Sequence, residues 1–405
     1  MAWENFKVEE QRLQLVKAFI AGDSSMTDLC LRYGISRKTA YKWYHRFLEE
    51  GIEGLKDQSR APLNPNILYE EELIERAIDY KLNHRTWGPK KILAYLRKAN
   101  PNEDWPSPTR LYQIFNDHNL VTKRRFKSRV PATSPLGGLT DCNDTWAVDF
   151  KGWFLTGDGR KCEPLTITDS VSRYLIRCTH LNKHSVDYVW PVFEEAFREY
   201  GLPNRMRSDN GPPFGSVGVG RLTRLSGNLI KAGVIPEWIN PGHPEENGRH
   251  ERFHLTLKQD TAKPPKETLI LQIEPMRAFQ EEYNHLRPHE ALGMNTPGSC
   301  YHNSSRLWDG VLRSPEYDTK EMLVRKVQTN GEITFRNEDL FIGEAIIGEY
   351  IGLKEIQNDE FTIHYGPIYL GKITKNGVEK PKREIRRKQR KSNPSSLEDQ
   401  NLGCY

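Results

Sequence analysis

The sequence predicts a multidomain protein in which two α-helical domains precede an α/β core and a small all-β, barrel-like domain. Three observations predict this fold class. Residues 8–120 carry apolar side chains at helical spacing in six successive runs. Residues 145–209 contain alternating, strand-like runs around one well-patterned helix. Residues 322–374 consist of short strand-like runs separated by Gly and Asn turns.

The first predicted domain, residues 1–57, has a helix-turn-helix outline. Helices are expected over 8–21, 26–33 and 37–51, and Ser36 can cap the third. The outward face of the third helix carries the side chains that would approach phosphates and base edges in a DNA major groove: Arg37, Lys38, Tyr41 and Lys42. A small helical bundle with a solvated face is the alternative, because such outlines also occur by chance.

The second predicted domain, residues 67–122, contains three further helices. Gly88-Pro89 and Ser107-Pro108 each place a proline in a first helical turn. A basic linker, residues 123–140, follows. Like-charge runs are usually only solvated, but a run between DNA-facing domains favours contact with the phosphate backbone. The cations predicted to bind DNA in these two segments are Lys90, Lys91, Arg110, Lys123, Arg124 and Arg125.

Two aspartates lie at strand ends in the predicted core, residues 141–301. The run 145–154 alternates so that Asp149 lies opposite the face of its apolar neighbours. The short strand 202–209 ends at Asp209, with an Asn-Gly turn behind it. Strand ends in open α/β sheets are where ligand-binding groups gather. Asp209 alone also fits a turn-forming aspartate, whereas apolar neighbours disfavour the alternative of Asp149 as a charge on a solvated edge.

A third acidic residue, Glu251, stands near the start of a predicted helix among cations and histidines. The helix is expected from Arg249, with Phe253 and Leu257 on its packing face. Glu251 falls on a different face, where the local field suits an anionic ligand or a metal with phosphate. Taken alone, the pattern favours an ordinary exposed glutamate paired with a cation such as Lys258.

The other core segments complete an α/β pattern. A hairpin turn over 156–161 and strands over 163–169 and 173–181 follow the Asp149 strand. A helix over 184–200 leads to the Asp209 strand, and a later helix is expected over 275–286 with its proline in the first turn. Structural rather than catalytic roles are expected for three polar residues: Asp169, Arg287 and His289.

After the core, the sequence pattern changes to short strand-like runs. Residues 317–378 predict a small β-barrel or sandwich, which has either a DNA-related or a purely structural role. Residues 379–405 predict a disordered basic tail that attracts DNA without sequence preference.

Four motifs together resemble one family: WAVDF around Asp149, RSDNGPPF around Asp209, HPEENGRHERFHLTLK around Glu251, and YNHLRPHEALGMNTPGSCY at 283–301. The chain resembles the DDE transposases of bacterial insertion sequences, which have a retroviral-integrase-like catalytic core (integrase core domain superfamily). The resemblance implies an RNase H-like core and makes the second domain a second helix-turn-helix. The interval between the second and third acids is longer than in the best-known retroviral members, and the excess is expected in residues 215–227.

The same resemblance implies the chemistry. Asp149, Asp209 and Glu251 would be the catalytic residues and the ligands of two Mg²⁺ or Mn²⁺ ions, which stabilise attacking and leaving oxygens at phosphorus. Cleavage of a transposon end would leave a 3′-hydroxyl, which would then attack target DNA. His254 and Lys258, one and two turns beyond Glu251, would contact DNA, with His254 able to orient substrate or act beside the metals.

Partners and compartment follow from composition and resemblance. A net charge of +5 and 28% charged residues describe a mildly basic chain. Its six cysteines form no C-x-x-C pair, and no long apolar run is present, so a bacterial cytoplasm is expected. The expected partners are double-stranded DNA, as terminal inverted repeats and target, and further copies of the chain in a homodimer or larger synaptic complex. The alternatives are a catalytically silent DNA-binding scaffold or repressor derived from a transposase, and a simple RNase H-like nuclease.

Overall fold

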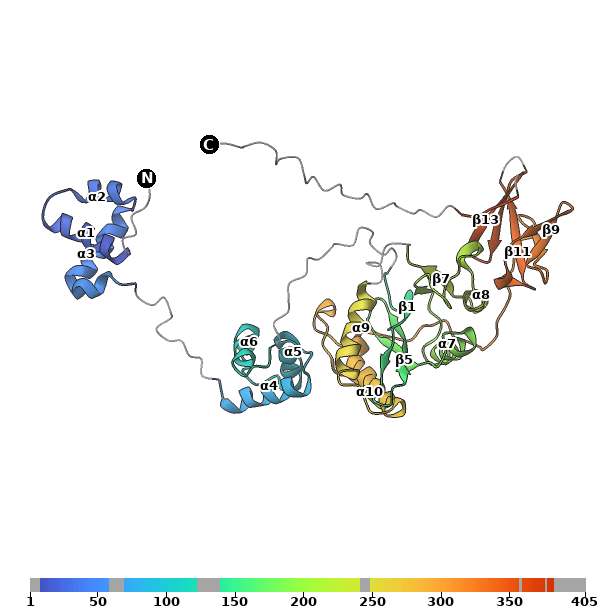
Figure 1. Cartoon of the computed structure of the whole chain (residues 1–405), viewed down its shortest axis with the longest axis horizontal. Coiled ribbons are helices and arrows are strands. Elements are labelled where there is room, and N and C mark those ends of the chain that lie inside the picture. Colours follow the sequence, from blue (N-terminus) through green and yellow to red (C-terminus); the bar gives the residue numbers. More distant parts are fainter. Residues whose placement is uncertain are drawn as a thin grey trace, which may run out of the picture. The chain divides into compact units, whose positions relative to one another are not determined.

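The structure is a computed structural model that describes residues 8–57, 69–121, 139–240, 248–356, 359–375 and 377–381 (Figure 1). It divides into two compact units, Met1–Leu68 and Tyr69–Tyr405. Several predicted features lie outside the described residues, namely most of the basic linker with Lys123, Arg124 and Arg125, and nearly all of the carboxy-terminal tail.

The first unit is the predicted three-helix domain. Helices α1 (Val8–Ile20), α2 (Met26–Tyr33) and α3 (Arg37–Glu50) are followed by a 3₁₀ turn, Gly51–Leu55. Ser36 caps α3 by accepting the Thr39 N–H. One buried cluster with Val16, Ala40 and Trp43 at its centre holds the helices together. The helix-turn-helix prediction is therefore confirmed at the level of local structure.

A second helical module opens the other unit. It comprises α4 (Glu71–Asn83), α5 (Pro89–Ala99) and α6 (Pro108–Asp117). As predicted, α5 and α6 begin with proline, whose missing N–H costs nothing in a first turn. Trp87 is completely buried and packs in the cluster that joins the three helices.

The core is built on a mixed five-stranded sheet with the order β5-β4-β1-β6-β7. Strands β1 (Thr145–Phe150), β4 (Pro164–Asp169) and β5 (Leu175–His180) are antiparallel, while β6 (Arg205–Ser208) and β7 (Ile235–Trp238) run parallel to β1. A small hairpin of β2 (Phe154–Leu155) and β3 (Lys161–Cys162) fills the predicted turn region. Three antiparallel strands followed by a helix and a parallel strand match the predicted order.

Helices cover both faces of this sheet (Figure 1). Helices α7 (Val186–Tyr200) and α8 (Arg224–Lys231) pack on the face that carries Trp146 and Val148. Helices α9 (Gly248–Thr261) and α10 (Leu269–Glu281) pack on the other face, where Phe253, Leu257 and Phe279 meet Cys178 of β5. The alternation predicted for the first strand is confirmed, since Asp149 belongs to the face covered by α9.

One detail differs from the sequence prediction. Helix α10 begins at Leu269 rather than at Pro275, because Thr268 caps it by accepting the Leu271 N–H and the proline is accommodated inside the helix. The segment expected to hold the excess interval between the second and third acids, 215–227, contains a 3₁₀ turn at Val219–Arg221 and the start of α8. A reciprocal capping box between Thr223 and Ser226 starts that helix.

The core ends in short turns, Glu282–Leu286 and Glu290–Leu292, and a short helix α11 (Pro297–Cys300). The β region follows. Strands β8 (Leu323–Lys326), β11 (Tyr350–Glu355), β12 (Phe361–Tyr365), β13 (Ile368–Thr374) and β14 (Gly377–Glu379) form one antiparallel sheet in the order β14-β13-β12-β11-β8. Strands β9 (Glu332–Phe335) and β10 (Glu338–Phe341) form a separate hairpin, and a 3₁₀ turn spans Glu344–Ile346.

This β region is not a closed barrel among the described residues. Strands β14 and β8 are the two edges of the five-stranded sheet, and the β9–β10 hairpin does not join them by strand pairing. Its buried side chains continue into the core domain through Val219, Leu222 and Ile230. The prediction of an all-β segment is confirmed, whereas barrel closure is not.

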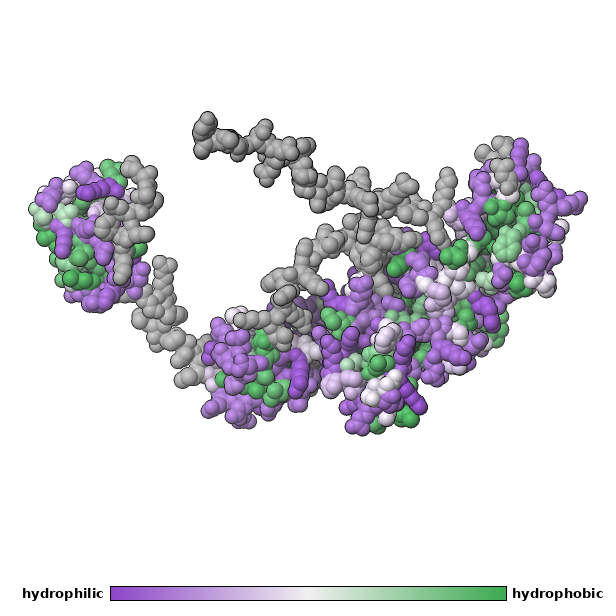
Figure 2. All heavy atoms as spheres, viewed as in Figure 1, coloured by the Kyte–Doolittle hydropathy of each residue, from purple (hydrophilic) through white to green (hydrophobic). Residues whose placement is uncertain are grey.

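The surface is mainly hydrophilic, with scattered hydrophobic patches on the face that Figure 2 shows. Mean hydropathy is −0.72. In the ranges that the structure describes, no helix combines the length and apolar character needed to cross a bilayer.

Candidate catalytic site

Asp149 lies near the end of β1 and Asp209 directly follows β6, the strand that pairs with β1. These parallel strands pair Thr145 with Arg205 and Ala147 with Arg207. Continued two residues past the last of these pairs, the register leads to Asp149 and Asp209, the second of which follows the end of β6. Neighbouring strands lie about 4.8 Å apart, so the two carboxylates start from adjacent backbone positions. Asp209 Oδ1 accepts the Gly211 N–H at 3.1 Å, which orients this carboxylate at the strand end.

Helix α9 is fastened to the sheet directly beside Asp149. Thr166 of β4 is the residue paired with Asp149, and its Oγ1 lies 3.1 Å from the Asp149 carbonyl oxygen. The same Oγ1 lies 2.8 Å from His250 Nε2 and 2.8 Å from His254 Nε2. His250 Nδ1 is 3.1 Å from Thr168 Oγ1. We call Thr166, Thr168, His250 and His254 the Thr–His anchor of α9.

The hydrogens of the Thr–His anchor follow from counting donors. Thr166 has one hydroxyl hydrogen, which it donates to the Asp149 carbonyl. Both histidines must then donate their Nε2–H to Thr166 Oγ1, and His250 Nδ1 accepts from Thr168. Burial lowers the pKa of His250 to about 3. Burial, with smaller contributions from His250 and Lys151, lowers the pKa of His254 to about 2. Both rings are therefore neutral at neutral pH, as these bonds require.

Glu251 follows directly after the buried anchor residue His250. It lies in the first turn of α9 and is exposed, as are Leu255 and Lys258 on the same face. The predicted separation of the two helix faces is confirmed by buried Phe253. A carboxylate in a first turn is stabilised by the positive end of the helix dipole.

A tight cluster of metal-ligand atoms also lies at this point. Asp149, His250 and His254 offer atoms that are all within 4.8 Å of one another. Both ring nitrogens of His250 are engaged by Thr166 and Thr168, and His254 Nε2 is engaged by Thr166. Among the described residues, Asp209 and Glu251 are outside this 4.8 Å cluster. The assignment of all three acids to one catalytic centre therefore stays a prediction.

Lys151 is a functional candidate that the sequence analysis did not single out. It is half-buried two residues beyond Asp149, and burial, followed by the charge of Lys258, lowers the pKa of its ammonium group. Its Nζ lies 4.9 Å from the centre of the Phe154 ring. The signal was available in the sequence, because residues two apart on a strand share a face. Lys151 and Lys258 place positive charge beside Asp149 and Glu251.

The predicted DNA-binding side chains lie in different surroundings. On α3, Arg37, Lys38, Tyr41 and Lys42 are all exposed, as are Lys90 of α5 and Arg110 of α6. Lys91, in contrast, is half-buried, and burial followed by the charge of Arg287 lowers its pKa to about 8. It faces charged residues beyond the helical module, since the charges that act on it are those of Arg287, Glu290 and Asp260.

Arg287 fastens the second helical module to the core. It is 4% exposed and donates to Asp260 Oδ2 at 2.9 Å and to Thr86 Oγ1 at 3.3 Å. Its guanidinium also lies 5.8 Å from the centre of the Trp87 ring. These contacts support the predicted structural role of this residue.

Asp169 is also structural, as predicted. Its carboxylate is 1% exposed and accepts from the backbone N–H groups of Asn143, Val171 and Ser172 and from the Ser172 hydroxyl. Burial raises its pKa, and these hydrogen bonds act in the opposite direction. The bonds from Val171 and Ser172 stabilise the turn after β4, and the bond from Asn143 ties this turn to the segment that precedes β1.

Family comparisons agree with this organisation. Models described as a helix-turn-helix domain and a homeodomain-like domain match residues 11–62 and 39–115. Two models described as an integrase core domain match residues 140–244 and 232–297. The second pair spans all three predicted acids.

Curated relatives are proteins of mobile elements. The chain is 25% identical over 230 residues to the insertion element IS476 uncharacterized 39.2 kDa protein of Xanthomonas euvesicatoria, covering 56% of this chain and 64% of the relative. It is 22% identical over an alignment of 432 residues to the transposase for transposon Tn552 of Staphylococcus aureus, covering 90% of this chain and 82% of the relative.

A solved structure, the HTLV-2 integrase catalytic core domain in complex with magnesium, covers 41% of this chain and 99% of that chain at 18% identity. Its TM-score of 0.33 is too low to support an argument about the fold. The strand order, the matched domains and the mobile-element relatives do support one conclusion. Residues 140–297 of the chain match an integrase core domain, and the chain is similar to proteins of bacterial insertion elements and transposons.

Proposed function

We propose that this protein is a DNA transposase that binds transposon ends, cleaves them in a metal-dependent reaction and joins their 3′-hydroxyl groups to target DNA. The observation that carries the proposal is the geometry around β1. Asp149 and Asp209 lie at the ends of the neighbouring strands β1 and β6, and the Thr–His anchor holds the helix that bears Glu251 against the strand next to Asp149. The named transposase of Staphylococcus aureus, aligned with 90% of the chain, supports the same function.

The proposed catalytic residues and metal ligands are Asp149, Asp209 and Glu251. Carboxylate oxygens are the ligands that Mg²⁺ and Mn²⁺ prefer, and the residues present fit such ions. The two histidines nearest Asp149 are neutral, so they add no positive charge that would oppose a divalent cation. Two bound ions would supply charge neutralisation at the scissile phosphate and stabilise the attacking and leaving oxygens.

The remaining side chains of the site position DNA. Lys258, exposed on the Glu251 face, and Lys151, beside Asp149, would each hold a phosphate of the substrate strand. His254 would orient groups next to Asp149 as a neutral ring rather than as a cation. In the first reaction water would attack the phosphorus at the transposon end, and the 3′-oxygen of the transposon strand would leave as a 3′-hydroxyl while the flanking strand keeps the 5′-phosphate. In the second, that hydroxyl attacks a target phosphodiester and a target 3′-hydroxyl leaves.

End recognition is assigned to the two helical modules. The exposed face of α3 carries four of the predicted contacts, and Lys90 and Arg110 remain available on the second module. The linker adds three proposed DNA contacts, Lys123, Arg124 and Arg125. Two modules read a longer sequence than one, which suits a protein that must find specific terminal repeats.

Assembly and compartment are also parts of the proposal. Bringing two transposon ends together requires at least a homodimer in a synaptic complex. The β region after the core would contribute to DNA binding or synapsis, and the protein would act on DNA in a bacterial cytoplasm. Light scattering on the complex with paired ends tests the assembly, and a monomer bound to both ends would contradict it.

The decisive test is strand transfer in vitro with labelled DNA ends from the flanks of this gene, a plasmid target and Mg²⁺ or Mn²⁺. Wild-type protein should give joined products that a chelator abolishes. Asp149→Asn, Asp209→Asn and Glu251→Gln should each bind the ends but give neither cleavage nor joining. Asp187→Asn, an exposed acid in the first turn of α7, is the matched control and should keep wild-type activity.

The outcomes separate the competing functions. Cleavage that survives each of the three substitutions would refute the assignment of the acids. End binding by wild-type protein without any cutting or joining in either metal would favour the scaffold or repressor. Cutting of any DNA without joining would favour a simple nuclease.

A further inference from the structure

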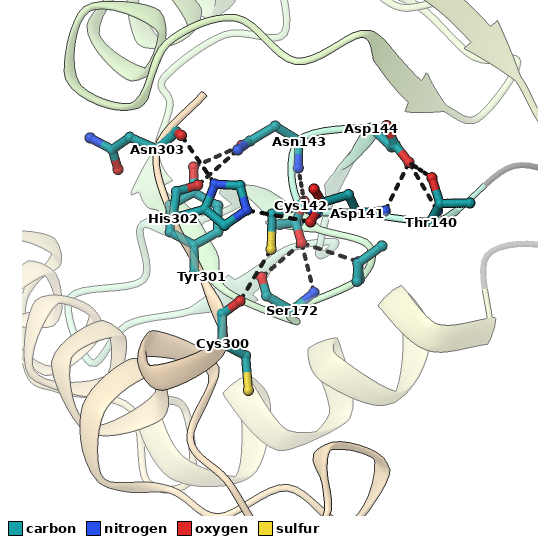
Figure 3. Close-up of polar contacts among 12 residues, drawn as sticks. Thr140, Asp141, Cys142, Asn143, Asp144, Ser172, Cys300, Tyr301, His302 and Asn303 are labelled. Atoms are coloured by element: carbon teal, nitrogen blue, oxygen red, sulfur yellow. Dashed lines mark hydrogen bonds and ion pairs between the residues drawn. The ribbon is translucent and has the colours of Figure 1, made fainter. Parts of the chain in front are cut away.

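A second cluster of metal-ligand side chains lies where the core begins and ends. Asp141 and Cys142 precede β1, and His302 follows α11. Asp141 and His302 are 161 residues apart in the sequence. Figure 3 shows the His302 ring and the Cys142 sulfur next to the Asp141 side chain. The ligand atoms of these three residues all lie within 4.8 Å of one another. None of the three belongs to the proposed catalytic centre.

The backbone around this cluster is held in place from both sides. Asn143 donates its side-chain N–H to the His302 carbonyl oxygen at 2.8 Å, and Tyr301 donates its hydroxyl to Asn143 Oδ1 at 2.9 Å. The Asn143 backbone N–H donates to the buried Asp169 carboxylate at 2.8 Å. The positions of the ligand-bearing segments are therefore fixed by hydrogen bonds that do not use the ligand atoms.

The hydrogen bonds of His302 prepare its other nitrogen for a cation. His302 Nδ1 lies 3.2 Å from the Asn303 carbonyl oxygen, which can only accept, so Nδ1 carries a hydrogen. Donation from one ring nitrogen to a carbonyl is the usual way in which a metal-binding histidine is oriented. Its Nε2 faces Asp141 Oδ1 at 3.3 Å. Two lone pairs at this distance require a proton or a metal ion between them.

The distance between His302 Nε2 and Asp141 Oδ1 fits a bound metal ion as well as a shared proton. In tetrahedral zinc sites, Zn–N and Zn–O bonds of about 2.1 Å put the nitrogen and oxygen ligands about 3.4 Å apart. The His302–Asp141 distance of 3.3 Å already matches that spacing. A Zn–S bond of about 2.3 Å puts sulfur about 3.6 Å from the nitrogen. Cys142 Sγ, now 3.2 Å from the Cys300 carbonyl oxygen, lies within 4.8 Å and needs to move by about 1 Å at most.

We propose that Asp141, Cys142 and His302 form a binding site for a divalent transition-metal ion of the Zn²⁺ class. A thiolate, an imidazole and a carboxylate together select zinc-like ions over Mg²⁺, the ion expected at an all-carboxylate centre. The ion ties the segment that enters the core to the segment that leaves it. Its role is structural, and it is separate from the cleavage and joining of DNA.

The test is Co²⁺ binding by the metal-stripped full-length chain, followed by absorption spectroscopy. One equivalent of Co²⁺ should produce the thiolate-to-cobalt charge-transfer band, and Zn²⁺ should displace it. Cys142→Ser should abolish the band, and His302→Gln should weaken Zn²⁺ binding by at least about 100-fold. Cys300→Ser is the matched control, since its thiol is two residues from His302 and points away from Cys142 (Figure 3). It should leave the band unchanged.

Thermal melting separates loss of the site from loss of the fold. In chelator, the wild type and His302→Gln should melt together, since the His302 side chain is 62% exposed. Zn²⁺ should raise the melting temperature of the wild type and of Asp209→Asn, but not of His302→Gln or Cys142→Ser. The proposal is overturned if the wild type gives no charge-transfer band, if the band persists in Cys142→Ser, or if Zn²⁺ raises the melting temperature of all variants equally.

Discussion

Replacing Thr166 with valine should loosen the helix that carries Glu251. Valine keeps the shape of the side chain but removes the hydroxyl that lies at the centre of the Thr–His anchor. That hydroxyl donates to the Asp149 carbonyl and accepts from His250 and His254, at distances of 2.8 to 3.1 Å. Thr166 is completely buried, so no water molecule takes the place of the lost hydroxyl group.

The expected cost follows from the groups that lose a partner. His250 is 2% exposed, so its Nε2–H would be left buried and unpaired, at a cost of about 1–3 kcal/mol. His254 is half-buried and can reach solvent, and the backbone carbonyl of Asp149 loses one donor, so each loses about the net value of a hydrogen bond, about 1 kcal/mol. The extra methyl group of valine offsets about 1 kcal/mol. A loss of about 2–4 kcal/mol remains, concentrated at the start of α9.

Hydrogen–deuterium exchange of the peptide covering 248–261 measures this effect locally. A loss of about 3 kcal/mol in the opening free energy corresponds to roughly 100-fold faster exchange. Thr168→Val is the matched control, because it removes a single bond to His250 Nδ1 and should accelerate exchange about tenfold or less. Equal exchange in Thr166→Val, Thr168→Val and wild type would refute the anchor. Strand transfer by Thr166→Val should fall in parallel.

Three further results are expected. Arg287→Met should lower the unfolding free energy by about 1–3 kcal/mol, because it leaves the Asp260 carboxylate, 20% exposed, without its partner; unchanged denaturant unfolding would contradict this. Lys91→Met should stabilise the protein at pH 7, because the folded-state pKa of Lys91, about 8, lies below its unfolded value. Between about pH 8 and 10.5 the folded state therefore binds fewer protons than the unfolded state, so the stability of the wild type rises with pH in this window. The destabilisation by charged Lys91 is complete below about pH 8, and the stability gained from methionine should shrink as pH rises through the window. Melting curves at several pH values measure this difference. Replacing Lys38 and Lys42 together with alanine should weaken binding to transposon ends and reduce the salt slope by about two; an unaltered slope in a filter-binding titration would remove α3 from the DNA interface.

Local structure and the order of elements were readable in the sequence because they depend on neighbours in the chain. Ser36 before α3 and the prolines that begin α5 and α6 marked helix starts, since caps and first turns involve residues within about one turn. The two faces of β1 followed from period-two alternation. Pro275 was misleading, because a proline in a first turn and a proline inside a helix have the same local sequence, and the Thr268 cap decides between them.

The candidate site was predicted in part. The motifs identified three acids, and their assignment to one centre stays a prediction; the structure adds that Asp149 and Asp209 lie at the ends of the neighbouring strands β1 and β6. His254 was expected on a DNA-facing surface, and its position against Thr166 could not be inferred, because a helix face acquires its neighbour only when the sheet forms. Lys91 illustrates the same limit, since its surroundings come from Arg287 in a distant segment.

The sequence by itself determined the elements, their order and the acids that they carry. These properties are set by hydrophobic periodicity, caps and turn residues, all of which act over a few positions. Only the tertiary structure decided which surfaces of those elements face each other. It placed His250 and His254 beneath Asp149, turned Lys91 toward the core and joined Asp141 to His302. Such contacts depend on register and packing between residues tens to hundreds of positions apart, where no local pattern records the partner.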